Sequence, residues 1–167
     1  MSSAESVKLL RELRPSDLVE LYRHSLDEDA RRMCAFTQNA LLDRRAFDER
    51  WTRQLADPAI RFRAIDRGGA AVGYVASFAR DGVPEVCYWL DKAHWGRGLA
   101  TAALRELLAL EPRRPIYGRV AFDNLGSIRV LEKCGFTREG LARRYLCING
   151  VWQDHLLFAR LKDDPQP

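Results

Sequence analysis

Hydrophobic and polar positions follow a helical period in the first third of the chain. Before that region, Val7–Leu13 alternates apolar and polar residues and predicts a short strand. Pro15-Ser16-Asp17 is a helix-start signal, and apolar residues then recur at helical spacing in several pieces from Asp17 to Ala56. Asp57-Pro58 ends this region, because the residue before a proline is driven away from helical geometry.

The period changes to two after Ile60, which predicts three strands in succession. We expect these strands over residues 61–66, from Ala70 to Ala79 and from Glu85 to Leu90. The glycine-containing turns at Arg67-Gly68-Gly69 and Asp81-Gly82 are short, so the three strands are expected to form an antiparallel meander.

The second half alternates between helices and strands. Leu99–Leu110 carries one apolar stripe and predicts a helix that Glu111-Pro112 ends. A shorter helix is expected from Leu125 to Cys134, with Gly135 as its left-handed cap. The remaining predicted elements are the strands Pro115–Ala121, Leu141–Ile148 and Trp152–Leu161, the last two joined by the hairpin signal Asn149-Gly150.

This order of elements predicts a mixed α/β (α+β) fold with one central, mostly antiparallel sheet flanked by helices. A chain of 167 residues fits one domain, and we expect residues 1–167 to form it, with a frayed tail over 163–167.

Composition and charge narrow the function classes. The net charge of +4 suits an anionic ligand, but no basic run with interleaved aromatic residues is present, so nucleic acid is not expected as a partner. No apolar run reaches the length of a membrane span, and the N-terminus lacks the features of a signal peptide, so a cytoplasmic protein is expected. The four cysteines show no metal or CxxC spacing and are expected to be reduced, packed thiols.

The segment between the third meander strand and the next helix is the main candidate for a binding site. It contains Gly96 and Gly98 directly before the helix that opens at Leu99. Glycines let a ligand approach the backbone, and the first N–H groups of a helix lack internal partners and attract anions. The absence of Gly-Lys-Ser/Thr and of a complete GxGxxG excludes a P-loop and a dinucleotide fingerprint. The alternative is a tight turn that binds nothing.

Three segments in order resemble the GNAT acetyltransferases, and in particular their Rim-like subgroup, the ribosomal-protein-alanine acetyltransferases. Trp95-Gly96-Arg97-Gly98-Leu99-Ala100 resembles motif A, written Q/R-x-x-G-x-G/A. The segment from Asn124 through Ser127 to Gly135-Phe136 resembles motif B, N-x-x-S … G-F. The stretch from Glu139 to His155 resembles the Rim-like C-terminal hairpin. Together they cover about residues 85–160, whereas the N-terminal half matches only in layout.

The resemblance implies a sheet splayed at the cofactor site and acetyl-CoA as the cosubstrate, with no metal. The backbone of Trp89 and Leu90 would pair with the pantetheine arm, and the turn would cradle the pyrophosphate. The residues implied in cofactor binding are Trp89, Leu90, Trp95, Gly96, Arg97, Gly98, Leu99, Ala100, Thr101, Asn124 and Ser127. For Asn124 a helix N-cap is an alternative that is compatible with this role.

Two departures from the family pattern matter. Trp95 stands where Gln or Arg is usual, which points to the Rim-like subgroup. Leu131 stands where many members carry a tyrosine that protonates the leaving thiolate, so the proton must come from another group or from water.

Glu85 and Ser127 are the catalytic candidates. Glu85 begins the strand that would carry the cofactor, where the family often keeps a glutamate base, although a solvated carboxylate beside a turn is the alternative. Ser127 matches the motif B serine and is a candidate acid or thiol-positioning group, or an ordinary first-turn residue. Asp154 and His155 have no third ligand, which excludes a metal site there.

These observations predict transfer of acetyl from acetyl-CoA to a primary amine by direct attack, with a protein N-terminal α-amine as the expected acceptor. A polyamine, amino acid or aminoglycoside acceptor is the alternative. A non-catalytic acyl-CoA-binding module and a nucleotide-binding protein are further alternatives. A homodimer is common among similar enzymes, and the sequence leaves the oligomeric state open.

Overall fold

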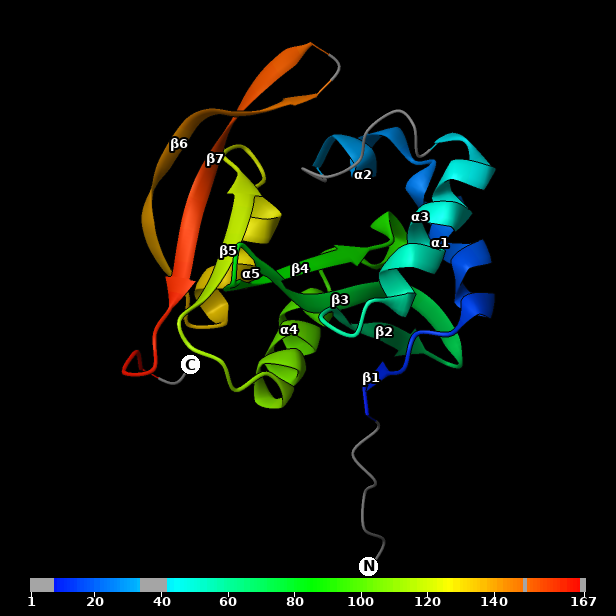
Figure 1. Ribbon diagram of the computed structural model, residues 1–167, viewed down its shortest axis with the longest axis horizontal. Coiled ribbons are helices and arrows are strands. Elements are labelled where there is room, and N and C mark those ends of the chain that lie inside the picture. Colours follow the sequence, from blue (N-terminus) through cyan, green and yellow to red (C-terminus); the bar gives the residue numbers. More distant parts are fainter. Residues whose placement is uncertain (1–7, 34–41, 149, 166–167) are drawn as a thin grey trace, which may run out of the picture.

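One seven-stranded sheet with helices on both faces organises the chain (Figure 1). The computed structural model describes residues 8–33, 42–148 and 150–165. The strand order is β1-β2-β3-β4-β5-β7-β6, and every neighbouring pair except β4–β5 is antiparallel. The predicted mixed, mostly antiparallel sheet is therefore confirmed.

Strands β2, β3 and β4 form the predicted meander, and β1 pairs with the outer edge of β2. Tight turns connect β2 to β3 and β3 to β4, and Gly69 and Gly82 in them have φ of 89° and 82°, a conformation that side chains disfavour. The strands are β1 (Leu10–Arg11), β2 (Arg61–Arg67), β3 (Ala70–Arg80) and β4 (Val83–Leu90).

The parallel pair β4–β5 opens the sheet. The C-terminal strands are β5 (Ile116–Ala121), β6 (Thr137–Ile148) and β7 (Val151–Arg160), and β7 lies between β5 and β6. Strand β4 pairs with β5 only at Glu85 and Tyr117, near the start of both strands. Beyond that pair the two strands share no ladder, and we call this opening the fork.

Helices cover the two faces of the sheet separately. Tyr74 and its neighbour Val75 point to opposite faces, because side chains alternate along a strand. Val75 belongs to the core beneath α4 (Leu99–Leu110) and α5 (Leu125–Lys133). Tyr74 belongs to the core beneath α1 (Leu18–Ser25) and α3 (Arg44–Ala56). The short α2 (Glu28–Met33) follows α1, and 3₁₀ turns lie at Pro15–Asp17 (η1) and Lys92–His94 (η3).

Each core is built from a different kind of side chain. The α4 core is aliphatic, and Leu104 and Leu107 of its apolar stripe are fully buried there. The α3 core is aromatic, and Trp51 contacts the rings of Phe62 and Tyr74 at centroid distances of 5.1 and 5.0 Å. The aliphatic core packs α4 and α5 against β4 and β5, which border the fork, whereas the aromatic core packs α1 and α3 against β2 and β3.

Two strands differ from the sequence-based boundaries. The first strand is limited to Leu10–Arg11, since only these residues pair with β2, and Val7 lies outside the described residues. Strand β6 begins at Thr137 rather than Leu141, because a register shift between Arg138 and Gly140 interrupts the alternation that the prediction used. Ile148 pairs with Val151 as the predicted hairpin requires, while Asn149 lies outside the described residues.

Cys134 and Cys147 are free thiols. Cys134 is buried, but Cys147 is exposed, so the prediction of packed thiols is wrong for Cys147, and Cys34 lies outside the described residues. In the part of the chain that is described, no helix is long and apolar enough to cross a membrane.

Candidate functional site

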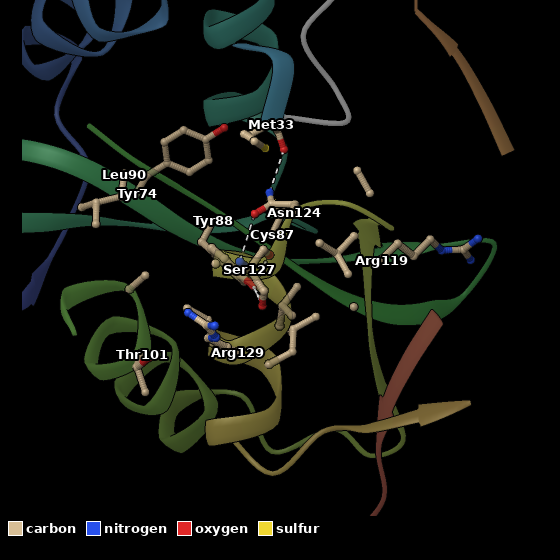
Figure 2. A pocket seen from close by; sticks show the side chains of 18 of the residues that line it. Met33, Tyr74, Cys87, Tyr88, Leu90, Thr101, Arg119, Asn124, Ser127 and Arg129 are labelled. Carbon is tan, nitrogen blue, oxygen red and sulfur yellow. Dashed lines mark hydrogen bonds between the residues drawn. The ribbon is translucent and has the colours of Figure 1, made fainter. Parts of the chain in front are cut away.

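A cavity of about 840 Å³ occupies the fork (Figure 2). Strands β4 and β5 form its walls, and the first turn of α4 and the length of α5 line one side of it. Ala30 and Met33 of α2 and Arg50 and Gln54 of α3 line the other side. The cavity therefore connects the two faces of the sheet, which would let two substrates meet from opposite sides.

The glycine turn at one end of the cavity places the N-terminus of α4 in the cavity lining. Gly96 and Gly98 have φ of 73° and 74°, so a side chain at either position would be strained. Gly98 is the N-cap of α4, and its carbonyl accepts the first helical bond, from the amide of Ala102. The amides of Leu99, Ala100 and Thr101 precede that bond and have no intrahelical acceptor, so they are available to an anion.

Trp95 fixes the glycine turn to the end of β4. Its indole Nε1 donates a hydrogen bond to the carbonyl of Leu90 at 2.8 Å, while the residue remains 41% exposed. The residue that departs from the usual Gln or Arg thus makes a specific contact between the strand and the turn.

Asn124 joins the two sides of the cavity. Its Oδ1 accepts the amide of Ser127 at 3.0 Å, which makes it the N-cap of α5, and its Nδ2 donates to the carbonyl of Met33 at 3.0 Å (Figure 2). The N-cap alternative is confirmed. The amide group also ties α2, on one side of the fork, to α5 on the other.

Ser127 forms a close polar pair with Tyr88, a residue that sequence reasoning missed. The two hydroxyl oxygens are 2.6 Å apart, and the Tyr88 hydroxyl lies 3.1 Å from the Ser127 carbonyl (Figure 2). Burial raises the pKa of Tyr88 well above its ordinary value, although the hydrogen bond with Ser127 acts in the opposite direction. Tyr88 therefore stays protonated and can donate to the Ser127 Oγ, which leaves the serine proton for another acceptor.

Tyr88 also supplies the phenol that Leu131 lacks. Leu131 is buried and lines the cavity, and its side chain packs so closely on Gly118 that a Cβ there would lie 2.9 Å from it. No proton can come from this position of α5. The cavity nevertheless contains a phenol, which comes from β4. The only sequence signal for it is the inward position of Tyr88 in the strand alternation.

Glu85 lies at the closed end of the fork and does not line the cavity. It is 2% exposed, and both carboxylate oxygens are ion-paired, Oε1 with Arg119 at 2.9 Å and Oε2 with Arg80 at 3.3 Å. The solvated alternative is wrong. A base role, which stays a prediction, would require this carboxylate to leave two guanidinium groups, so the geometry favours a structural role.

The cavity brings together most of the residues implied in cofactor binding. Arg97 and Trp89 do not line it: Arg97 is exposed, and the Trp89 side chain is buried away from it. The predicted residues that do line it are Leu90, Trp95, Gly96, Gly98, Leu99, Ala100, Thr101, Asn124 and Ser127. Among the described residues, no group of three His, Cys, Asp or Glu side chains is placed to hold a metal ion.

Comparisons with known proteins agree with this geometry. YjcK of Bacillus subtilis, named as a probable N-acetyltransferase, is 48% identical over 84 residues, which span 47% of this chain and 46% of that protein. The N-alpha-acetyltransferase RimI of Mycobacterium tuberculosis is 32% identical over 120 residues, 69% of this chain and 75% of that protein. A solved structure of RimL, a ribosomal L7/L12 alpha-N-protein acetyltransferase, in complex with coenzyme A has the same fold, with a TM-score of 0.78 and 20% identity over 92% of this chain and 93% of that chain.

The family comparison covers most of the chain. The model of the acetyltransferase (GNAT) domain matches residues 9–137, from the first strand to the start of β6, and so includes the fork, the glycine turn and α5. The chain therefore belongs to the GNAT acetyltransferase family, and its relatives include enzymes of the Rim type.

Proposed function

We propose that this chain transfers acetyl from acetyl-CoA to the N-terminal α-amine of a peptide or protein. The observation that carries the proposal is the cavity in the fork, which has an anion site at one end and the Ser127–Tyr88 pair in its wall. GNAT enzymes use acetyl-CoA, so a site for a phosphate-bearing thioester is the expected use of this arrangement.

The two sides of the cavity would hold the two substrates. The pyrophosphate would contact the amides from Leu99 to Thr101, where the helix dipole adds favourable charge. The pantetheine arm would lie along the edge of β4 that β5 leaves unpaired beyond Glu85. The amine would enter from the side formed by α2 and α3 and meet the thioester in the fork.

The reaction would be a direct acyl transfer. The neutral amine nitrogen attacks the thioester carbonyl carbon, the C–S bond breaks, and the amine loses one proton to solvent. We propose that the Ser127 hydroxyl donates a proton to the departing thiolate and regains one from the solvent, while Tyr88 stays protonated and orients Ser127 as a donor to its Oγ. A peptide α-amine has an ordinary pKa of about 7.7–8.0, so a useful fraction is neutral without a strong base.

The relatives support an α-amine as acceptor. RimI is named an N-alpha-acetyltransferase, and RimL is described as acting on the α-amine of a ribosomal protein.

The direct test measures thiol release from acetyl-CoA with a panel of amines. We expect turnover with peptides that begin with Ala, Ser or Met, and none with the same peptides carrying an acetylated N-terminus. Turnover of only a polyamine, amino acid or aminoglycoside would refute the peptide acceptor. Saturable acetyl-CoA binding without thiol release from any amine would indicate the non-catalytic alternative.

A further inference from the structure

The charged side chains that line the cavity are mostly cationic on both sides. On the α5 side, Arg129 and Lys133 are available to the phosphates of the cofactor, and Figure 2 shows Arg129 extending toward α4. On the opposite side the cations are Arg50 of α3, Arg80 of β3 and Arg119 of β5. In Figure 2 the Arg119 side chain points away from α4, so cofactor phosphates at the glycine turn do not explain this second group.

Carboxylates that could balance these arginines are scarce in the lining. Among the described residues that line the cavity, Asp123 is the one acidic side chain, and it lies next to Asn124 at the start of α5. Residues 34–41, whose structure is not described, include no Asp or Glu in their sequence.

Glu85 balances only part of the positive charge that Arg80 of β3 and Arg119 of β5 bring to the wall of the cavity. Its single buried carboxylate is shared by Arg80 and Arg119, whose side chains are 36% and 27% exposed. Arg119 also donates from Nη1 to the Tyr145 hydroxyl at 2.6 Å, which holds the guanidinium in place. Arg80 and Arg119 thus bring two positive charges to this wall against the one carboxylate of Glu85, and Arg50 of α3 is a further cation of the cavity lining.

We infer that the acceptor carries carboxylates close to its reacting amine, and specifically that it is a peptide N-terminus followed by acidic side chains. The inference rests on the proposed function and names its substrate class. Guanidinium groups bind carboxylates through paired, charge-assisted hydrogen bonds, which favours an acidic segment on this side of the cavity. The same charges repel a polyamine, which brings several cations and no anion.

Three peptides that differ only at positions two and three provide the test: Ala-Glu-Glu, Ala-Gln-Gln and Ala-Lys-Lys at the start of one common sequence. We expect kcat/KM to fall from the acidic to the neutral to the basic peptide, by about tenfold at each step, or about 1.4 kcal/mol. The differences should shrink at high salt, because the charges are partly exposed. Equal or faster turnover of the lysine peptide or of spermidine would overturn the inference, and faster turnover of free glutamate would overturn its peptide part.

A pair of charge reversals on α3 separates the cavity from the general surface charge. Arg50→Glu is expected to reduce or invert the preference for the acidic peptide, and Arg50→Gln to weaken it. Arg53→Glu, on an exposed residue of the same helix outside the cavity lining, should leave the preference unchanged. An unchanged preference in both Arg50 variants contradicts the inference alone. Absence of thiol release with every amine contradicts the proposed function as well.

Discussion

At the scale of single residues, we propose that the hydroxyl groups of Ser127 and Tyr88 assist the departure of the thiolate. Their 2.6 Å contact places a protonated phenol behind a serine in the cavity wall, although α5 carries Leu131 where the family often has tyrosine. The phenol in the cavity thus comes from β4 instead of α5, and it contacts the cavity through Ser127.

Ser127→Ala is expected to lower kcat by about 10²-fold, a typical contribution of a positioned acid, with little change in acetyl-CoA affinity. Tyr88→Phe should lower kcat by about tenfold, because Ser127 keeps its hydroxyl but loses its orienting donor. Tyr117→Phe removes a β5 hydroxyl outside the cavity lining and serves as the control. Steady-state kinetics with one peptide measures all three, and an unchanged kcat in Ser127→Ala removes Ser127 from the mechanism.

His155 predicts how stability depends on pH. It is 1% exposed, both ring nitrogens lack a hydrogen-bond partner in the described structure, and its ring lies 4.9 Å from that of Tyr145. Burial, and then the charge of Arg119, lower the pKa of His155 from 6.5. The unfolded chain therefore binds a proton at His155 more readily than the folded chain. The contribution of neutral His155 to the stability of the fold is fully present above about pH 6.5 and is lost as the pH decreases below it.

Thermal melting between pH 7.5 and pH 5 checks this expectation. The melting temperature of the protein should fall toward pH 5, and His155→Phe, which keeps a ring but cannot titrate, should fall less. His24, whose pKa burial also lowers, leaves a residual slope in the variant. Identical slopes of melting temperature against pH in the two proteins would show that His155 does not contribute to the pH dependence of stability.

At the scale of elements, Asn124 links the helix that opens at the cavity to the helix across the fork. Asn124→Ala removes the N-cap of α5 and the bond to Met33, and should cost about 1 kcal/mol, or about 2–4 °C in melting temperature. Asn124→Asp keeps an acceptor for the cap but loses the donor to Met33, so it should retain most of the stability while loosening α2.

Hydrogen exchange of the α2 amides reports on the bond between Asn124 and Met33. Both variants lose this bond, so faster exchange is expected in both. Asp43→Ala is the matched control, since Asp43 caps α3 through the amide of Ala46 and lies outside the cavity lining. It should lose similar stability with normal turnover and normal α2 exchange. Unchanged α2 exchange in Asn124→Asp would contradict the proposed link.

Local patterns predicted most elements because local physics determines them. The helix Leu99–Leu110 matches its predicted bounds, since its apolar stripe begins after a glycine and ends before a proline. The register shifts of β6 and the position of β7 between β5 and β6 depend on contacts between distant segments, which no local period records. The pairing of Tyr88 with Ser127 and of Glu85 with two arginines could not be predicted for the same reason.

At the scale of the whole molecule, the fold opens one cavity to both faces of the sheet. The parallel β4–β5 pair opens the sheet, the aliphatic core fixes the glycine turn on one face, and the aromatic core fixes α3 on the other. A cavity formed in this way is open to both faces, which direct transfer between two bound substrates requires.

The most direct test of the central claim, that the fork is an acetyl-CoA site, is a calorimetric titration of the purified protein with acetyl-CoA and, separately, with ATP. We expect one acetyl-CoA per chain, bound at least about tenfold more tightly than ATP, because the pantetheine arm adds contacts along β4 that ATP cannot make. Equal or tighter binding of ATP, or no saturable binding of acetyl-CoA, would contradict the claim.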